Sequence, residues 1–119
     1  MRFLAVIAVL AVAAVALAQA PARTPELLAA GQAAYEGQTA GCHACHGLTG
    51  EGNGPVAFAL NPRPRNFTKD PFKAGDSVDQ IYATITHGLP NTSMASYAHL
   101  SDDTRWALAY YVQSFRPRK

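Results

Sequence analysis

The sequence predicts one all-α domain. Apolar residues recur at helical spacing in three segments after residue 23, and capping residues flank each of these segments. No segment alternates apolar and polar residues over a useful length, as a half-buried strand would. A chain of 119 residues has room for a single compact domain at most.

The first helix is expected to begin after Thr24, which can cap it, with Pro25 at its first position. Gly37 is expected to end it. The residues on one side of this helix are Leu27, Leu28, Gly31, Ala34 and Tyr35. That side should pack against the rest of the domain.

Two further helices carry equally clear caps. Ser77 and Gln80 form a capping box before an apolar stripe, and Gly88 supplies the stop. Ser101 is expected to cap the last helix, whose first turn is acidic. The stripe of the first of these helices is Val78, Ile81, Tyr82 and Ile85, and that of the last is Leu108, Tyr111, Val112 and Phe115, flanked by Trp106 and Tyr110.

Between residues 41 and 75 the periodicity disappears, and glycine and proline dominate. Only a short turn near residues 56–60 is expected there. A compact domain rarely keeps so long an irregular segment unless the segment wraps something.

Residues 1–20 are typical of a secretory signal peptide. Arg2 gives a positive start, residues 4–18 are an apolar run of fifteen, and small residues follow. Cleavage is expected after Ala18 or Ala20, which leaves the domain at 21–119 in the periplasm. The alternative is an uncleaved anchor, but the run is shorter than the ~20 residues that span a membrane. No other segment approaches that length, so the mature form is expected to have no membrane span.

The charge balance argues against a nucleic-acid partner. Without Arg2 the chain has nine Lys and Arg against eight Asp and Glu. A nucleic-acid-binding domain of this size normally carries a marked basic excess.

The segment Cys42-His43-Ala44-Cys45-His46 is a C-x-x-C-H motif. On one helical turn the two thiols face the same way, so both can reach one edge of a porphyrin, while His46 points an imidazole nitrogen at the iron. The motif predicts one haem c, covalently bound through Cys42 and Cys45. The alternatives are a zinc ribbon, which lacks a second ligand pair, a thioredoxin-like dithiol, which lacks a βαβ pattern, and a structural disulfide.

The sixth iron ligand is expected to be Met94, the only methionine after residue 20. It lies in an irregular segment that needs no core filling. His87 and His99 are the alternative ligands. His43, between the two cysteines, is expected to face solvent.

The ring of His46 should donate its outer N–H to a fixed acceptor. The carbonyl of Pro55 is the candidate for this role. The alternative is that Gly54-Pro55 is only a turn.

Taken in order, these motifs resemble the class I cytochrome c family over nearly all of the mature chain. The matching segments are Gly31 to Tyr35, Cys42 to His46, Gly52 to Pro55, Met94 and Tyr111-Val112. The run from Pro62 to Phe67 and the helix of Trp106 look most like small bacterial periplasmic monohaem cytochromes. Ala95 departs from the pattern, since many relatives have Pro there. The resemblance implies crossed N- and C-terminal helices, with loops that wrap one covalently bound haem.

Residue chemistry and resemblance both predict an electron carrier rather than an enzyme. It would pass single electrons between respiratory redox partners, because His46 and Met94 fill both axial sites. The alternatives are a haem subunit of a larger periplasmic oxidoreductase, an open-site haem enzyme or sensor, and, if the protein is colourless, a thiol oxidoreductase. Four basic residues form either a docking site for an acidic redox partner or an ordinary solvated face: Arg63, Arg65, Lys69 and Lys73.

Overall fold

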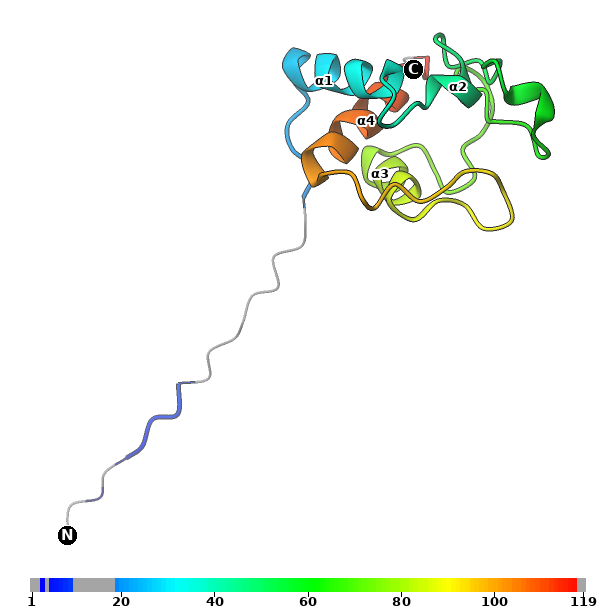
Figure 1. Cartoon of the computed structure of the whole chain (residues 1–119). Helices are drawn as coiled ribbons and strands as arrows, with labels where there is room; N and C mark the ends of the chain where they lie inside the picture. Colours follow the sequence, from blue (N-terminus) through cyan, green and yellow to red (C-terminus); the bar gives the residue numbers. More distant parts are fainter. Residues whose placement is uncertain (1–2, 4, 10–18, 118–119) are drawn as a thin grey trace.

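The computed structural model describes residues 3, 5–9 and 19–117, and these residues contain helices and no strand. The predicted all-α fold is confirmed (Figure 1). The elements are α1 (Pro25–Glu36), α2 (His43–His46), the 3₁₀ helix η1 (Ala57–Ala59), α3 (Val78–His87) and α4 (Asp102–Ser114). Most of the predicted leader, with the cleavage position Ala18, lies outside the described residues.

The helices begin where their capping residues predict. Thr24 accepts a hydrogen bond from the backbone N–H of Leu27 at 3.1 Å. Ser77 and Gln80 form the predicted capping box before α3, with both bonds present. Ser101 caps α4 by accepting from Thr104 at 3.2 Å. Each cap satisfies N–H groups that have no partner inside the helix.

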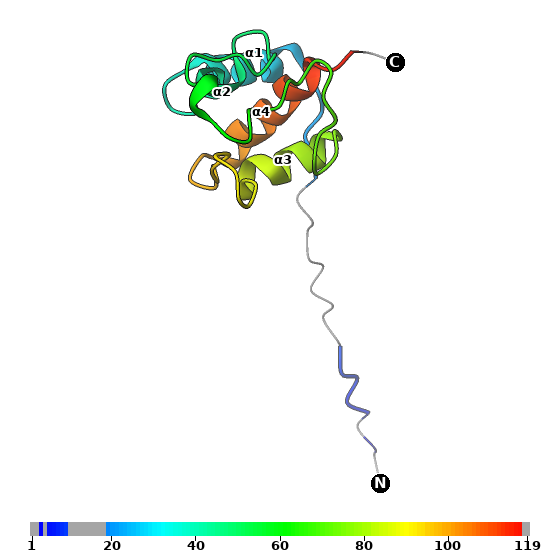
Figure 2. The same cartoon turned by 90° about the vertical axis from the view of Figure 1, so that its right-hand side faces the viewer.

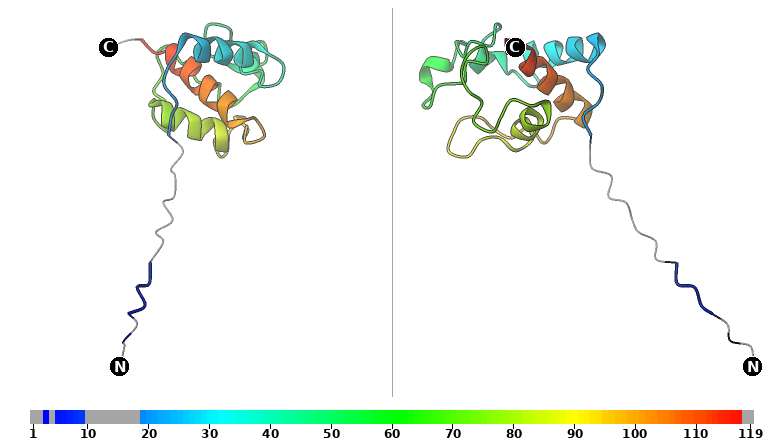
Figure 3. Two further views of the ribbon diagram at one scale, coloured as in Figure 1. Left: turned by 90° about the vertical axis from the view of Figure 1, so that its left-hand side faces the viewer. Right: turned by 180° about the vertical axis from the view of Figure 1, so that it is seen from behind.

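Helix α4 runs between α1 and α3, as two perpendicular views show (Figures 2 and 3). It is largely buried, and Leu108 at its centre is inaccessible to solvent. Helices α1 and α4 cross at Gly31. A Cβ atom on Gly31 would lie 2.8 Å from both the carbonyl carbon of Ala107 and the Cβ of Tyr111. The absence of a side chain at this position therefore allows the close approach of the two helices.

Replacing Gly31 by Leu should destabilise the domain by roughly 1 to 3 kcal/mol, because the added side chain overpacks this crossing. Ala30→Leu is the matched control, since Ala30 is exposed on the same helix. Thermal unfolding of both variants checks the expectation. Equal melting temperatures for the two variants would contradict it.

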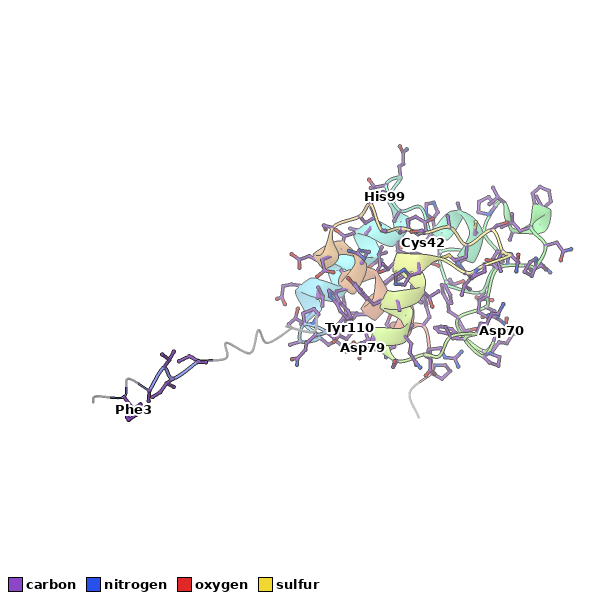
Figure 4. The ribbon with its side chains drawn as sticks, turned by 90° about the horizontal axis from the view of Figure 1, so that it is seen from below. Phe3, Cys42, Asp70, Asp79, His99 and Tyr110 are labelled. Atoms are coloured by element: carbon purple, nitrogen blue, oxygen red, sulfur yellow. The ribbon has the colours of Figure 1, made fainter. Side chains whose placement is uncertain are left out.

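The segment before α1 is hydrogen-bonded to α4. The hydroxyl of Tyr110 donates to the carbonyl oxygen of Pro21 at 2.6 Å, at the point where the leader meets the domain (Figure 4). The folded domain thus extends back at least to Pro21. Within the described residues, no helix has the length and apolar character needed to cross a membrane.

The irregular middle segment runs beside α2 and satisfies its carbonyl groups. The backbone N–H groups of Gly52, Gly54 and Val56 donate to the carbonyls of His46, Cys45 and Ala44, at 2.8, 3.0 and 3.1 Å. A one-turn helix has no internal partners for these carbonyls. A Cβ on Gly54 would lie 2.5 Å from the carbonyl carbon of Ala44, so this close approach requires glycine. The predicted turn appears as η1.

Candidate functional site

Both cysteines lie on one helical turn, as predicted: Cys45 is within α2 and Cys42 is its N-cap residue. Cys42 precedes the helix with helical φ and ψ angles of −56° and −32°, and the N–H of His46 donates to its carbonyl at 2.9 Å. Both thiols are free and half-buried. Burial raises the pKa of Cys42 to about 11, with a smaller contribution from Cys45. A thiol of that pKa is a poor nucleophile near neutral pH, which argues against the dithiol-oxidoreductase alternative.

The imidazole of His46 is held on one side by backbone. Its Nδ1–H donates to the carbonyl oxygen of Arg65 at 3.1 Å, which leaves Nε2 for a ligand. Burial lowers the pKa of His46, and the hydrogen bond to Arg65 offsets part of this effect. Burial therefore favours the neutral ring, which is the form that binds a metal. Phe67 stacks on it, with ring centroids 4.2 Å apart and planes 18° from parallel.

The prediction that Pro55 accepts the His46 proton is wrong, because Arg65 takes that place. Pro55 is exposed, and its neighbours Gly54 and Val56 are hydrogen-bonded to the carbonyls of α2. The residues that contact the ring of His46 come after η1 in the sequence. Pro55 instead lines a surface hollow of about 310 Å³ together with His43 and Leu48.

The expectation that His43 faces solvent also needs correction. Its side chain is half-buried, and its Nδ1–H donates to the carbonyl oxygen of Tyr35 at 3.1 Å. The hydroxyl of Tyr35, which is fully buried, donates to the carbonyl oxygen of Gly47 at 2.6 Å. The last turn of α1 thus holds α2 at both its ends. The sequence places Tyr35 on the buried side of the first helix but does not indicate these partners.

Met94 lies in a tightly closed loop between α3 and α4. The N–H of Leu89 donates to the carbonyl of Met94 at 3.0 Å, and the N–H of Met94 donates to Oγ1 of Thr92 at 3.1 Å. The side chain is half-buried and packs against the hydrophobic core, as does Cys42. Figure 1 shows α2 and this loop at the same end of the domain.

Tyr97, three residues after Met94, packs against the same hydrophobic core as Cys42. Burial raises the pKa of Tyr97, and the charges of Cys42 and Cys45 add to the rise. The alternative ligands are less suitably placed, because His87 and His99 are exposed. Figure 4 shows His99 near the edge of the domain and Cys42 further inside.

The donor set of this end of the molecule fits haem c. It offers two thiols on one helical turn, a neutral imidazole with one free nitrogen, and a thioether beside an apolar aromatic cluster. The described residues contain no group of three or more His, Cys, Asp or Glu side chains able to hold a metal ion. The zinc alternative therefore has no ligand set in this part of the chain.

Comparison with known proteins identifies the family. The family model described as "Cytochrome C oxidase, cbb3-type, subunit III" matches residues 26–112. The chain belongs to this family of class I c-type cytochrome domains. The family carries haem iron and takes part in electron transport, so the predicted resemblance is confirmed at this level. No curated protein matches the chain.

A solved structure shares the cytochrome fold. The "Kuenenia stuttgartiensis reducing HAO-like protein complex" has a chain that is 37% identical, with a TM-score of 0.77. The match covers 83% of this chain and 48% of that one. This cytochrome domain therefore spans about half the length of its structural relative.

Proposed function

We propose that the chain is an exported carrier of single electrons with one haem c bound through Cys42 and Cys45. His46 and Met94 are its axial ligands in this proposal. The observation that carries it is the geometry of the His46 imidazole, which is held at Nδ1 by the Arg65 carbonyl and lies one residue after the second cysteine. When bound, haem c supplies one-electron Fe(III)/Fe(II) chemistry.

The residues around His46 fix the tautomer and the orientation of its imidazole ring. The Arg65 carbonyl selects the tautomer with the proton on Nδ1 and makes the ring a stronger donor at Nε2. Phe67 restricts rotation of the ring by stacking on it. Met94 contributes a neutral thioether, which favours ferrous iron and so gives a positive potential. With His46 and Met94 both bound to it, the iron would have no position open to a substrate.

The location that we propose is the periplasm, with a signal peptide within residues 1–20 removed by cleavage after Ala18 or Ala20. Either cut leaves Pro21, the partner of Tyr110, in the mature domain. In an oxidising compartment two free cysteines normally pair with each other. Thioether bonds to haem would consume both thiols and prevent this.

Export of the whole chain in a bacterium that attaches haem c tests the proposal. The purified protein should gain the mass of one haem, which should stay bound after denaturation, and its N-terminus should be Gln19 or Pro21. The visible spectra of both oxidation states should be those of low-spin haem. A colourless protein with two titratable thiols would support the thiol-oxidoreductase alternative instead.

A haem subunit of a larger oxidoreductase is the second candidate. It is favoured because the similar structure belongs to a protein complex and its chain is about twice as long as the matched region. Purification from the native membrane and periplasmic fractions distinguishes the two candidates. A stable second polypeptide supports the subunit, and a free monomer supports the shuttle.

Docking of an acidic redox partner is expected to depend on the basic segment. Arg63, Lys69 and Lys73 are exposed, whereas Arg65 is half-buried and uses its carbonyl for His46. The double variant Arg63→Glu and Lys69→Glu should slow electron transfer with the native partner roughly tenfold at low salt, because steering of charged partners depends on complementary fields. Arg23→Glu, at an exposed site before α1, is the control. If stopped-flow rates and salt slopes equal those of the wild type, this segment is only a solvated face.

A further inference from the structure

The side chain of Arg116, just beyond α4, contacts several residues of the loop that follows Pro64. Its Nη1 donates to the carbonyl oxygens of Phe67 and Asp70 at 3.2 and 2.6 Å. Its Nε lies 3.7 Å from a carboxylate oxygen of Asp76. Its guanidinium carbon lies 4.7 Å from the centroid of the Phe72 ring. One side chain thus makes four contacts along ten residues of an otherwise irregular segment.

The same loop supplies both groups that touch the imidazole of His46. The Arg65 carbonyl accepts from Nδ1, and the Phe67 ring stacks on the imidazole. Phe67 is fixed through its own backbone, since its N–H donates to Gly50 at 2.7 Å and its carbonyl accepts from Arg116. A displacement of this loop would therefore move the acceptor and the stacked ring together.

We propose that Arg116 is a positioning residue for the His46 imidazole. It acts through the loop, without touching the imidazole itself. This inference rests on the proposed function, because it takes His46 to be the iron ligand. Arginine suits the task because its planar guanidinium offers five N–H donors, which can reach carbonyls and a carboxylate while the plane lies over an aromatic ring. A lysine ammonium is a single point of attachment and cannot reproduce all of these contacts.

A purely structural role for Arg116 makes a different prediction. The proton on Nδ1 of His46 exchanges with solvent only when its hydrogen bond to Arg65 opens. If Arg116 holds the loop, its loss should speed this local opening and leave global unfolding less affected. If Arg116 only stabilises the whole domain, exchange at His46 should follow exchange in the buried core, for example at the amide of Leu108.

The experiment uses the haem-loaded protein with Arg116→Gln and Arg116→Lys, and NMR follows hydrogen exchange. In Arg116→Gln, exchange at His46 Nδ1–H should be at least roughly tenfold faster relative to the Leu108 amide, as expected for local opening. The haem methyl shifts of the ferric protein should also change, because they report ring orientation. Arg116→Lys should fall between Arg116→Gln and wild type, and it provides the same measurement if Arg116→Gln fails to fold.

Arg105→Gln is the matched control. The Arg105 side chain is 15% exposed against 24% for Arg116. It also bridges two helices, by donating to Thr86 of α3, and it pairs with Asp102 within α4. Among the described residues, none of its hydrogen bonds or ion pairs reaches the loop. Unchanged exchange at His46 in both Arg116 variants, or an equal change in Arg105→Gln, would overturn the inference. A protein that never acquires covalent haem would instead contradict the proposed function.

Discussion

Met94→Ala should lower the reduction potential and open the iron to external ligands. The choice of axial ligands changes the reduction potential of haem over a range of about 0.8 V. Loss of a neutral thioether removes a group that favours ferrous iron. The ferric variant should lose the weak far-red band that arises from sulfur bound to iron. The ferrous variant should bind carbon monoxide rapidly, whereas the wild type should be six-coordinate and slow to do so.

The exposed histidines provide the controls for Met94. His87→Ala and His99→Ala should leave the potential and the far-red band unchanged, because both side chains are exposed. Rapid carbon monoxide binding by the wild type would favour the open-site enzyme or sensor. A wild type without the band that still excludes carbon monoxide would identify one of these histidines as the ligand.

Cys45→Ser should yield little haem-loaded protein and a chain that proteases degrade readily. Helix α2 has only four residues, and an isolated helix of that length is not stable in water. Its position depends on two hydrogen bonds with Tyr35, whose hydroxyl donates to Gly47 and whose carbonyl accepts from His43, and on hydrogen bonds from the glycine-rich segment. Covalent attachment would fix this turn to the haem, which we expect to form a large part of the core.

Ala44→Ser is the control for this variant, since it adds the same hydroxyl within the same turn and keeps both thiols. Its yield of holoprotein should be close to that of the wild type. Limited proteolysis and circular dichroism measure the fold of each variant. A compact, helical and haem-free Cys45→Ser protein would show that folding and haem attachment are separate events.

The features that the sequence predicted are local or periodic. The starts of three helices could be predicted because an N-cap interacts only with the next three residues. These N-caps are Thr24, Ser77 and Ser101. Gly31 could be placed at the crossing because a glycine on an apolar stripe suggests close approach of another backbone. The motif from Cys42 to His46 is likewise confined to one turn.

The features that the sequence missed depend on contacts between distant segments. Arg65, and not Pro55, provides the acceptor, because the residues on both sides of Pro55 are hydrogen-bonded to carbonyls of α2. No pattern in the sequence shows which later carbonyl lies beside the ring of His46. The acceptor of His43 is the backbone carbonyl of Tyr35. Every residue has such a carbonyl, so the sequence does not indicate this hydrogen bond. Phe58, Phe67 and Phe72 all lie in the irregular segment, so the sequence offered three candidate aromatic partners for His46 without indicating which one stacks on it.

The crossing of α1 and α4 joins the first and last helices of the described domain, so the domain can close only after both have been made. A chain made or exported from its N-terminus presents α1 and the Cys42 to His46 turn well before α4 is available. Gly31 and Tyr35 cannot meet Tyr111 until α4 has emerged. During that interval both cysteines stand on a chain without its closing helix, so an enzyme that attached the proposed haem would reach thiols that the finished domain half-buries.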